Sequence, residues 1–411
     1  MQFALRNLAL VLKNKDFVFL TIGEAISSFG NRFFKIAFPI LIYNLSKSAI
    51  ALSTMIVIET LPQILFGLFL GVALDRYDRK KIIMYSIVIQ TLLVLIIPLL
   101  IHVNAHLFFY YVIAFLLSLF GMVYDTSVSV IIPSICAKRD IQVYNSVFQT
   151  IRTISKLVGP GLGGLLISIY SISSVLIFDA VTFIVLLLML IKVTVPQIPL
   201  NKSRFKFSEL FEGIKTIKKS KVIWSTVILV VFINIAMQAF NASLVYYTKH
   251  ELYLKDDLVG IIFSFAGLGG IAGGIIAGTL TNKFTPGKIL IFSCLLLSGF
   301  ITCYPFFANW ILAGAMYAVI SLLVTVMDVT IISTIQQTTN NDILGKVITS
   351  INVLTLTISP LGALISGPLT SITSIQTTFV TFGLVTILGV FFSLNKQFLS
   401  YKYTDTNTKS V

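Results

Sequence analysis

Long apolar runs recur along the whole chain, and short segments with polar or turn-forming residues separate them. A helix needs about 20 predominantly apolar residues to cross roughly 30 Å of hydrocarbon. Twelve runs meet this requirement, at 17–43, 49–74, 82–103, 106–134, 145–168, 172–193, 222–248, 258–280, 287–305, 309–335, 346–367 and 375–394. The pattern therefore predicts an all-α membrane protein with twelve transmembrane helices.

The polar break at 194–221 is longer than the others and divides the chain into two halves. We expect an N-terminal six-helix bundle at 1–193, a cytoplasmic central loop at 194–221, and a C-terminal six-helix bundle with a short cytoplasmic tail at 222–411. Basic loops stay on the cytoplasmic side of a membrane. With the N-terminus inside, the cytoplasmic segments hold 23 of the 30 basic residues. We therefore expect a multi-pass protein of the plasma membrane with both termini cytoplasmic.

Composition supports the membrane class and excludes others. Hydrophobic residues make up 56% of the chain and charged residues 11%, against roughly a quarter charged in soluble domains, so membrane lipid must cover most of it. The net charge of +14 lies in loops, not on a soluble basic face, so nucleic acid is not expected as a partner. Cys136, Cys294 and Cys303 show no CxxC spacing, and we expect neither a metal site nor a cofactor. The chain has no GxxxxGK[ST] loop for direct use of ATP.

The two halves repeat each other, as a transporter built from two repeats requires. The end of the second span recurs at the end of the eighth with an offset of 207 residues. Asp125 and Asp328 correspond within a few residues, as do the prolines of spans five and eleven. The matching stretches are Gly67-x3-Gly71-x3-Asp75-Arg76-Tyr77 with Gly274-x3-Gly278-x3-Asn282-Lys283-Phe284, and Gly159-Pro160 with Ser359-Pro360.

The loop after the second span is a candidate gate. Gly67 and Gly71 share a helical face and permit close approach of a neighbouring helix. Asp75 at the membrane edge can meet a helix N-terminus or an arginine, in a latch that breaks as the protein rocks. The alternative is a helix-packing face followed by a positively charged cytoplasmic loop. That alternative would explain the basic residues, but not the spacing of the two glycines, the presence of Asp75 or the matching stretch in the second half. The candidate gating residues are Gly67, Gly71, Asp75, Arg76, Arg79 and Lys80.

At these residues the chain resembles the major facilitator superfamily, whose loop between helices two and three carries a G-x3-(D)-R-x-G-R-K type signature. Asp78 stands where glycine is commonest, a departure that resembles the macrolide-efflux branch. Further similarities to that branch are Gly23-x3-Ser27-x2-Gly30, Asp179-Ala180, Glu212-Gly213 and Gly345-Lys346-Val347. The resemblance covers nearly the whole chain. It implies two six-helix repeats and a secondary transporter of small molecules, and we expect it to function as a monomer.

Span five carries Gly159-Pro160-Gly161-Leu162-Gly163-Gly164. Proline removes a helix hydrogen bond and glycines thin the helix, so this segment can bend and pack tightly. It resembles the GPxxGG signature of proton antiporters, which implies export and makes Gly159, Pro160, Gly163 and Gly164 candidates. Ser155 stands where an upstream glycine is usual, and a kinked packing helix of any transporter is the alternative.

Charges inside spans are expensive and usually face a cavity or a partner. Eight of the nine lie in the first half, which predicts proton handling there; they are Glu24, Glu59, Asp125, Asp179, Asp328, Arg32, Lys35, Arg152 and Lys156. A carboxylate in a span can take a proton on one side and release it on the other as access alternates. We expect this role for Glu24, Glu59 and Asp125, with Arg152 holding one of them charged. A permanent structural ion pair stays open for each acid, and Asp179 is expected to be structural.

Span seven places Asn234, Gln238 and Asn241 on one helix face, where they could hydrogen-bond a substrate. Arg32 joins them as a cavity candidate, and Asp328 does so especially for a cationic substrate. We expect proton-coupled efflux of amphipathic small molecules such as macrolide-like drugs. A carrier for a lipid, siderophore or nutrient is the alternative. A membrane enzyme would need clustered acids or histidines, and a receptor would not explain the repeat.

Overall fold

The computed structural model describes residues 12–74, 78–136, 140–195, 214–339 and 341–401. Nearly all of them are helical, because a backbone in lipid must satisfy its hydrogen bonds within the segment. The helices of the first half are α2 (Lys15–Ser46), α3 (Ala49–Leu74), α4 (Arg79–His102), α5 (Leu107–Ile135), α6 (Ile141–Ile169) and α7 (Ile172–Lys192).

The helices that follow are α9 (Lys221–Tyr246) with the π-helical turn η2 (Tyr247–Glu251), α10 (Asp256–Lys283), α11 (Pro286–Cys303) with the 3-10 turn η3 (Tyr304–Phe306), α12 (Trp310–Thr338), α13 (Asn341–Ile358), α14 (Pro360–Ile372), α15 (Ile375–Ser393) and α16 (Lys396–Ser400). The expected span at 346–367 is thus two helices that meet at Ser359. Pro360 has no N–H to donate, so the hydrogen-bonded ladder breaks there.

Within the described residues, ten helical stretches are long and apolar enough to cross a membrane, and α13 with α14 form one of them. Helices α2 and α6 fall outside this group, and they complete twelve spans. Both carry charges in their length, Arg32 and Lys35 on α2 and Arg152 and Lys156 on α6. The prediction of an all-α protein with twelve spans is confirmed.

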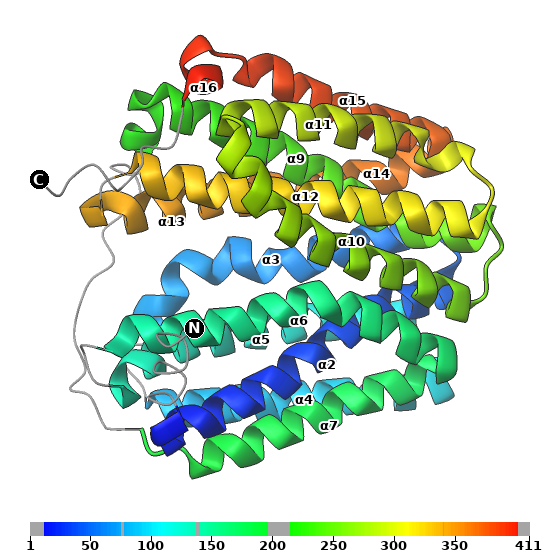
Figure 1. The fold of residues 1–411 in the computed structure, drawn as a ribbon. Helices are drawn as coiled ribbons and strands as arrows, with labels where there is room; N and C mark the ends of the chain where they lie inside the picture. The colour runs from blue at the N-terminus through cyan, green and yellow to red at the C-terminus, as the bar shows by residue number, and fades with distance from the viewer. Residues whose placement is uncertain (1–11, 75–77, 137–139, 196–213, 340, 402–411) are drawn as a thin grey trace, which may run out of the picture. The chain divides into compact units, whose positions relative to one another are not determined.

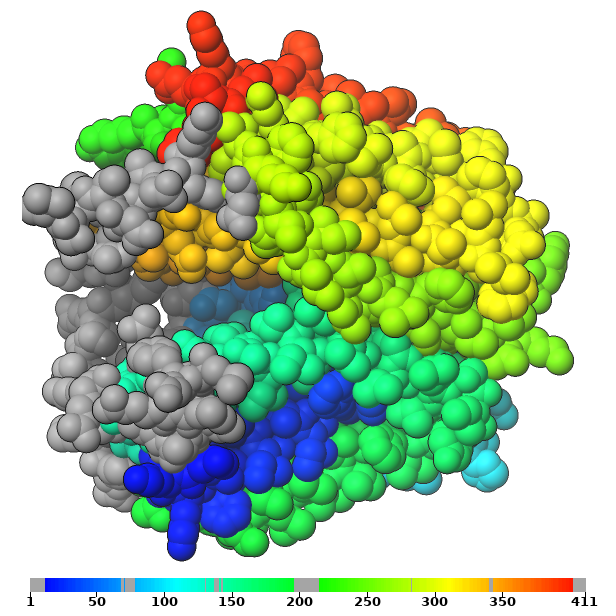
Figure 2. All heavy atoms as spheres, in the orientation of Figure 1, coloured from blue at the N-terminus to red at the C-terminus, as the bar shows by residue number. Residues whose placement is uncertain are grey.

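The chain folds as two compact units, and the first comprises Met1–Ser46, Ile58–Phe205 and Asp256–Ser264. In it α2 packs against α6 and α7, and α4 packs against α5 and α7 (Figure 1). On the face seen in the space-filling view, the blue atoms of α2 lie next to the green atoms of its neighbours α6 and α7 (Figure 2). Glycine allows the closest of these approaches. A Cβ on Gly23 of α2 would lie 2.8 Å from Cδ1 and 3.2 Å from Cα of Leu186 on α7. Helix α2 is therefore held between α6 and α7, which positions its polar side chains.

Side chains tie the helix ends of this unit together. Asn14 Nδ2 donates to the carbonyl of Ile135 at the end of α5, at 2.8 Å. At the end of α7, Lys80 Nζ donates to the carbonyls of Ile191 at 3.0 Å and Val193 at 2.8 Å. These bonds satisfy carbonyls that a helix C-terminus leaves without a partner in the helix.

The second unit comprises Lys47–Val57, Lys206–Lys255 and Phe265–Val411. Helix α9 packs against α14 and α15, and α11 packs against α12 and α15. Aromatic rings fill one end of this core: the ring centroid of Phe240 lies 5.1 Å from that of Tyr304 and 5.5 Å from that of Phe379. The short helix α16 docks on α11, where Phe398 is buried and Thr285 Oγ1 donates to the carbonyl of Leu399 at 2.9 Å.

Candidate functional site

A polar stripe runs along α2 in the first unit. Glu24, Ser28, Arg32 and Lys35 follow one another at spacings of four, four and three residues, which places them on one helix face. The tight approach of Gly23 to α7 occupies a different face. The sequence of α2 therefore separates a packing side from a side that carries charge.

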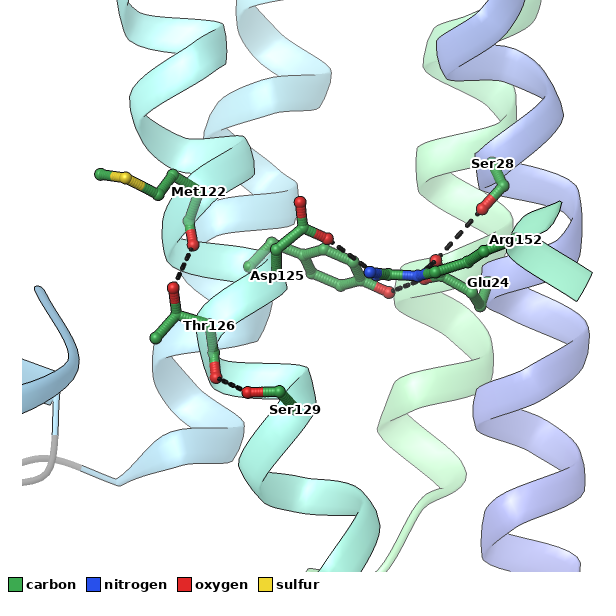
Figure 3. A network of polar contacts seen from close by, with 8 residues as sticks. Glu24, Ser28, Met122, Asp125, Thr126, Ser129 and Arg152 are labelled. Carbon is green, nitrogen blue, oxygen red and sulfur yellow. Dashed lines mark hydrogen bonds and ion pairs between the residues drawn. The ribbon is translucent and has the colours of Figure 1, made fainter. Parts of the chain in front are cut away.

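Arg152 of α6 binds two acids from two other helices (Figure 3). Its Nε donates to Glu24 Oε1 on α2 at 2.6 Å, and its Nη2 donates to Asp125 Oδ1 on α5 at 2.7 Å. The hydroxyl of Tyr124 donates to Glu24 Oε2, and Ser28 Oγ donates to Glu24 Oε1 at 3.1 Å. Three helices thus meet at one guanidinium, and three donors surround the Glu24 carboxylate.

The two acids differ in how far their side chains are buried in the protein. The Glu24 side chain is 4% exposed and the Arg152 side chain 29%, whereas the Asp125 side chain is 60% exposed. The guanidinium carbon also lies 4.9 Å from the ring centroid of Phe148, in a cation–π contact on α6 itself. One arginine therefore joins a buried carboxylate to an exposed one.

Glu59 lies apart from this ion-pair network. It is half-buried on α3, and its backbone carbonyl accepts a hydrogen bond from the Ser118 hydroxyl of α5. Its carboxylate acts electrostatically on Lys35 of α2. The structure thus brings together Glu24, Asp125 and Arg152 of the four residues proposed for proton coupling.

The glycines of the span-five motif face two neighbours. A Cβ on Gly159 would lie 2.6 Å from Cγ of Arg32, and one on Gly163 would lie 3.0 Å from Cδ1 of Phe33. Gly164 instead meets the first turns of α10, where a Cβ would overlap the carbonyl of Gly260. Pro160 lies between them, inside α6. The motif allows α6 to approach α2 on one side and the start of α10 on the other.

The gating candidates are only partly described. Asp75 and Arg76 lie outside the described residues, and Gly71 lies within the last turns of α3. A Cβ on Gly67 would meet only Sδ of Met122 on α5, at the ordinary contact distance of 4.0 Å. Arg79 is half-buried at the start of α4. Lys80 is engaged at the end of α7, as described above.

The expected cavity residues of the second half occupy two helices. Asn234 is half-buried on α9, and its Nδ2 donates to the carbonyl of Val230 at 2.8 Å, one turn earlier. Gln238 is half-buried and Asn241 exposed on the same helix. Asp328 is half-buried on α12.

Asp179 of α7 is buried, and its surroundings agree with a structural role. A Cβ on Gly30 of α2 would come within 2.5 Å of Asp179 Oδ1, so this glycine leaves the space that the carboxylate occupies. Thr182 Oγ1 donates to the Asp179 carbonyl at 2.7 Å. The pair Gly30 and Asp179, 149 positions apart in the chain, is one packing unit.

Sequence reasoning missed two partners of Glu24. Ser28 lies one turn after it, so helical spacing could have found the contact. Tyr124 and Asp125 are adjacent on α5. Tyr124 donates to Glu24 and Asp125 accepts from Arg152, and nothing in the sequence indicates that both belong to one network. That arrangement depends on where three helices meet.

Twelve membrane helices, with an ion-pair network among the helices of the first unit, are typical of membrane transport proteins, because charges inside spans often mark ion or substrate pathways. Residues 20–361 match the profile of the Major Facilitator Superfamily. The chain belongs to this family and is therefore a transporter rather than an enzyme.

Curated relatives include exporters. "Putative bacilysin exporter BacE" of Bacillus subtilis (strain 168) is 28% identical over 231 residues, which are 54% of this chain and 55% of that protein. The match thus spans about half the length of that relative. "Macrolide efflux protein A" of Streptococcus pyogenes is 19% identical over 269 residues, 63% of this chain and 65% of that protein. YfiS of Bacillus subtilis (strain 168), an uncharacterized MFS-type transporter, is 23% identical over 94% of this chain and 96% of that protein.

Solved structures share the fold. A bacterial homologue of the human lysosomal transporter Spinster superposes with a TM-score of 0.71 at 12% identity, covering 92% of this chain and 95% of that one. The nucleoside transporter NupG superposes with a TM-score of 0.72 at 12% identity, covering 94% of this chain and 100% of that one.

Proposed function

We propose that the chain is a secondary transporter of the plasma membrane that exports amphipathic small molecules, macrolide-like drugs among them, in exchange for protons. The observation that carries the proposal is Arg152, which joins the buried Glu24 to the exposed Asp125. Two relatives named as exporters support the direction of transport. Both termini are cytoplasmic in this proposal, and the bundles at 1–193 and 222–411 alternate access as a monomer.

The network offers a place for one proton. Two carboxylates and one guanidinium carry a net charge of −1, and one proton makes the group neutral. Glu24 accepts bonds from Arg152, Tyr124 and Ser28, whereas the Asp125 carboxylate is exposed and is bound by Arg152. A proton therefore arrives at Asp125, because protonating it sacrifices one charge-assisted bond, while protonating Glu24 would weaken three contacts.

Protonation can then act on helix packing. A neutral Asp125 holds Arg152 less firmly, which loosens the link between α5 and α6. Helix α6 contains Pro160 and the glycines that pack on Arg32 and on the start of α10. The helix that senses the proton is thus also the one built to bend. Asp75 and Arg76 complete the proposal as parts of a gate.

Inverted membrane vesicles that contain the protein test this proposal. Radiolabelled erythromycin and ethidium should accumulate when the vesicle interior is acidified, and a protonophore should abolish accumulation. Asp125→Asn and Glu24→Gln should reduce proton-driven accumulation by about tenfold or more, as expected for removal of a charged group that acts in the step itself. Glu251→Gln, an exposed acid after α9, is the control and should behave as the parent.

Full proton-driven accumulation in both variants would refute the assignment of the coupling acids. If the parent protein ignores both drugs yet carries a labelled lipid or siderophore, the family's carrier function holds and drug efflux is wrong.

A further inference from the structure

The short helix α16 depends on the second unit for its structure. It has five residues, Lys396–Ser400, and lies beside α9 and α11 (Figure 1). Isolated helices shorter than about 12–15 residues are marginal in water. Asn395 supplies a local cap, because its Oδ1 accepts from the Gln397 amide at 2.9 Å. The rest of the stabilisation must come from contacts with the helices on which α16 docks.

A buried ring and a hydrogen bond fasten α16 to its neighbours. The Phe398 side chain is fully buried, whereas Gln397 and Ser400 are exposed. Thr285 is the N-cap of α11, a position whose hydroxyl usually accepts from its own helix. Here Thr285 Oγ1 donates to the Leu399 carbonyl at 2.9 Å. Contacts of this size can open locally while the rest of the unit stays folded.

Gly287 leaves the space in which the backbone of α16 lies. A Cβ on Gly287 would be 2.3 Å from the carbonyl oxygen of Phe398, 2.9 Å from its carbonyl carbon and 3.2 Å from Cα of Leu399. These are the nearest atoms to that position, and all of them belong to α16. The first turn of α11 is therefore shaped to accept this segment.

The internal repeat gives this docking surface a counterpart in the first unit. The offset of 207 residues relates Asp78, the N-cap of α4, to Thr285, and it relates Lys80 to Gly287. Lys80 Nζ binds the carbonyls at the end of α7. In the second unit the side chain is missing, and the backbone that follows α15 lies in its place. Each unit thus fastens the start of its third helix to the end of its sixth.

We propose that residues 395–401 are a detachable clasp, which docks on α9 and on Thr285 and Gly287 and thereby holds α11 to the end of α15. The clasp does for α11 what Lys80 does for α4. When the clasp leaves its surface, α11 loses a fastening that α4 keeps, so the start of α11 becomes the more mobile of the two. The inference holds for any substrate and any coupling ion.

Hydrogen exchange of the full chain in lipid nanodiscs tests the clasp. Gly287→Ala places a Cβ against the clasp backbone and should release it. The amide of Ile289, which donates to the Thr285 carbonyl, should then exchange about 10-fold to 100-fold faster, as overpacking at a docked segment predicts. The start of α4 should exchange as in the parent. Gly299→Ala is the matched control, because a Cβ at that position of α11 meets nothing within 4 Å.

Removing the clasp separates its effect from a local effect of the alanine. A chain that stops at Leu394 should show the same faster exchange at the start of α11. Adding Gly287→Ala to the shortened chain should change nothing further, because the clasp that the Cβ would meet is already absent. Phe398→Ala removes the buried ring and should also speed exchange at Ile289, which keeps the test valid if the shortened chain fails to fold.

The proposal is overturned if Gly287→Ala exchanges no faster at Ile289 than Gly299→Ala does. It is also overturned if Gly287→Ala still speeds exchange in the shortened chain. An acceleration that spreads equally to α4 and α12 would mean that residues 395–401 add only to general stability, which would overturn the clasp as well. Acceleration confined to α9 and α11 would support it.

Discussion

Replacing Arg152 by methionine should destabilise the first unit through the charge it leaves behind. Glu24 is 4% exposed and would lose the guanidinium 2.6 Å away. Breaking a buried pair from one side costs about 3–5 kcal/mol, because the remaining charge is uncompensated. Asp125 is 60% exposed, so its lost pair adds only about 0–1 kcal/mol. We expect Arg152→Met to lower the free energy of unfolding by about 3–5 kcal/mol at pH 7.

The double variant Glu24→Gln with Arg152→Met should recover most of this loss, because neutral replacement of both partners removes the stranded charge. Equilibrium unfolding by sodium dodecyl sulfate in mixed micelles measures these differences. Lys156→Met, at an exposed position one turn along α6, should cost less than about 1 kcal/mol.

The reasoning would be refuted if Arg152→Met cost less than about 1 kcal/mol. It would also fail if the double variant were no more stable than the single one. Either result would mean that the Glu24 carboxylate does not depend on Arg152 for its stability in the folded protein, and the charge-sharing network would lose its basis.

Three further substitutions test the packing that holds the site. Gly30→Ala should lower the free energy of unfolding by about 1–3 kcal/mol by overpacking, since the added Cβ would come within 2.5 Å of Asp179 Oδ1. The same unfolding titration measures this change, and an unchanged stability would contradict the packing. Lys80→Met should lower the free energy of unfolding by about 1 kcal/mol, because it removes the donor to the carbonyls at the end of α7. Hydrogen exchange at Val193 and Thr194 should become faster, and unchanged exchange would contradict the prediction. Thr285→Val should release α16 by removing its bond to the Leu399 carbonyl, seen as faster proteolysis after Lys396, while Thr279→Val on an exposed face of α10 should not.

The spacing of residues within one helix was sufficient for several features of the site. The placement of Asn234, Gln238 and Asn241 on one face follows from 3.6 residues per turn, and the same spacing could have shown the stripe from Glu24 to Lys35, which was not predicted. The expectation that Arg152 holds an acid also followed from the cost of a charge in a span. These inferences need only the chain and its solvent, because helix geometry and lipid polarity are the same wherever the helix lies.

Contacts between helices could not be inferred in the same way. Nothing in the chain indicates that Arg152 takes both Glu24 and Asp125, that Tyr124 bonds to the same carboxylate, or that Gly159 accommodates Arg32. Nor does the sequence show that Lys80, expected in the gate, binds the end of α7. Each contact depends on the rotation and depth of two helices, and hydrophobic periodicity is weak in spans that are apolar on most sides.

The sequence by itself determined the membrane class, the twelve spans and the concentration of charge in the first half. The reason is that hydrocarbon excludes both unsatisfied backbone and unpaired charge, so composition along the chain reports directly on what lipid can cover. The tertiary structure alone decided which charges pair. Glu24 and Arg152 are more than a hundred positions apart, and they meet because glycines bring α2, α6 and α7 together. The same packing leaves Arg32 and Lys35 without a bonded partner among the described residues.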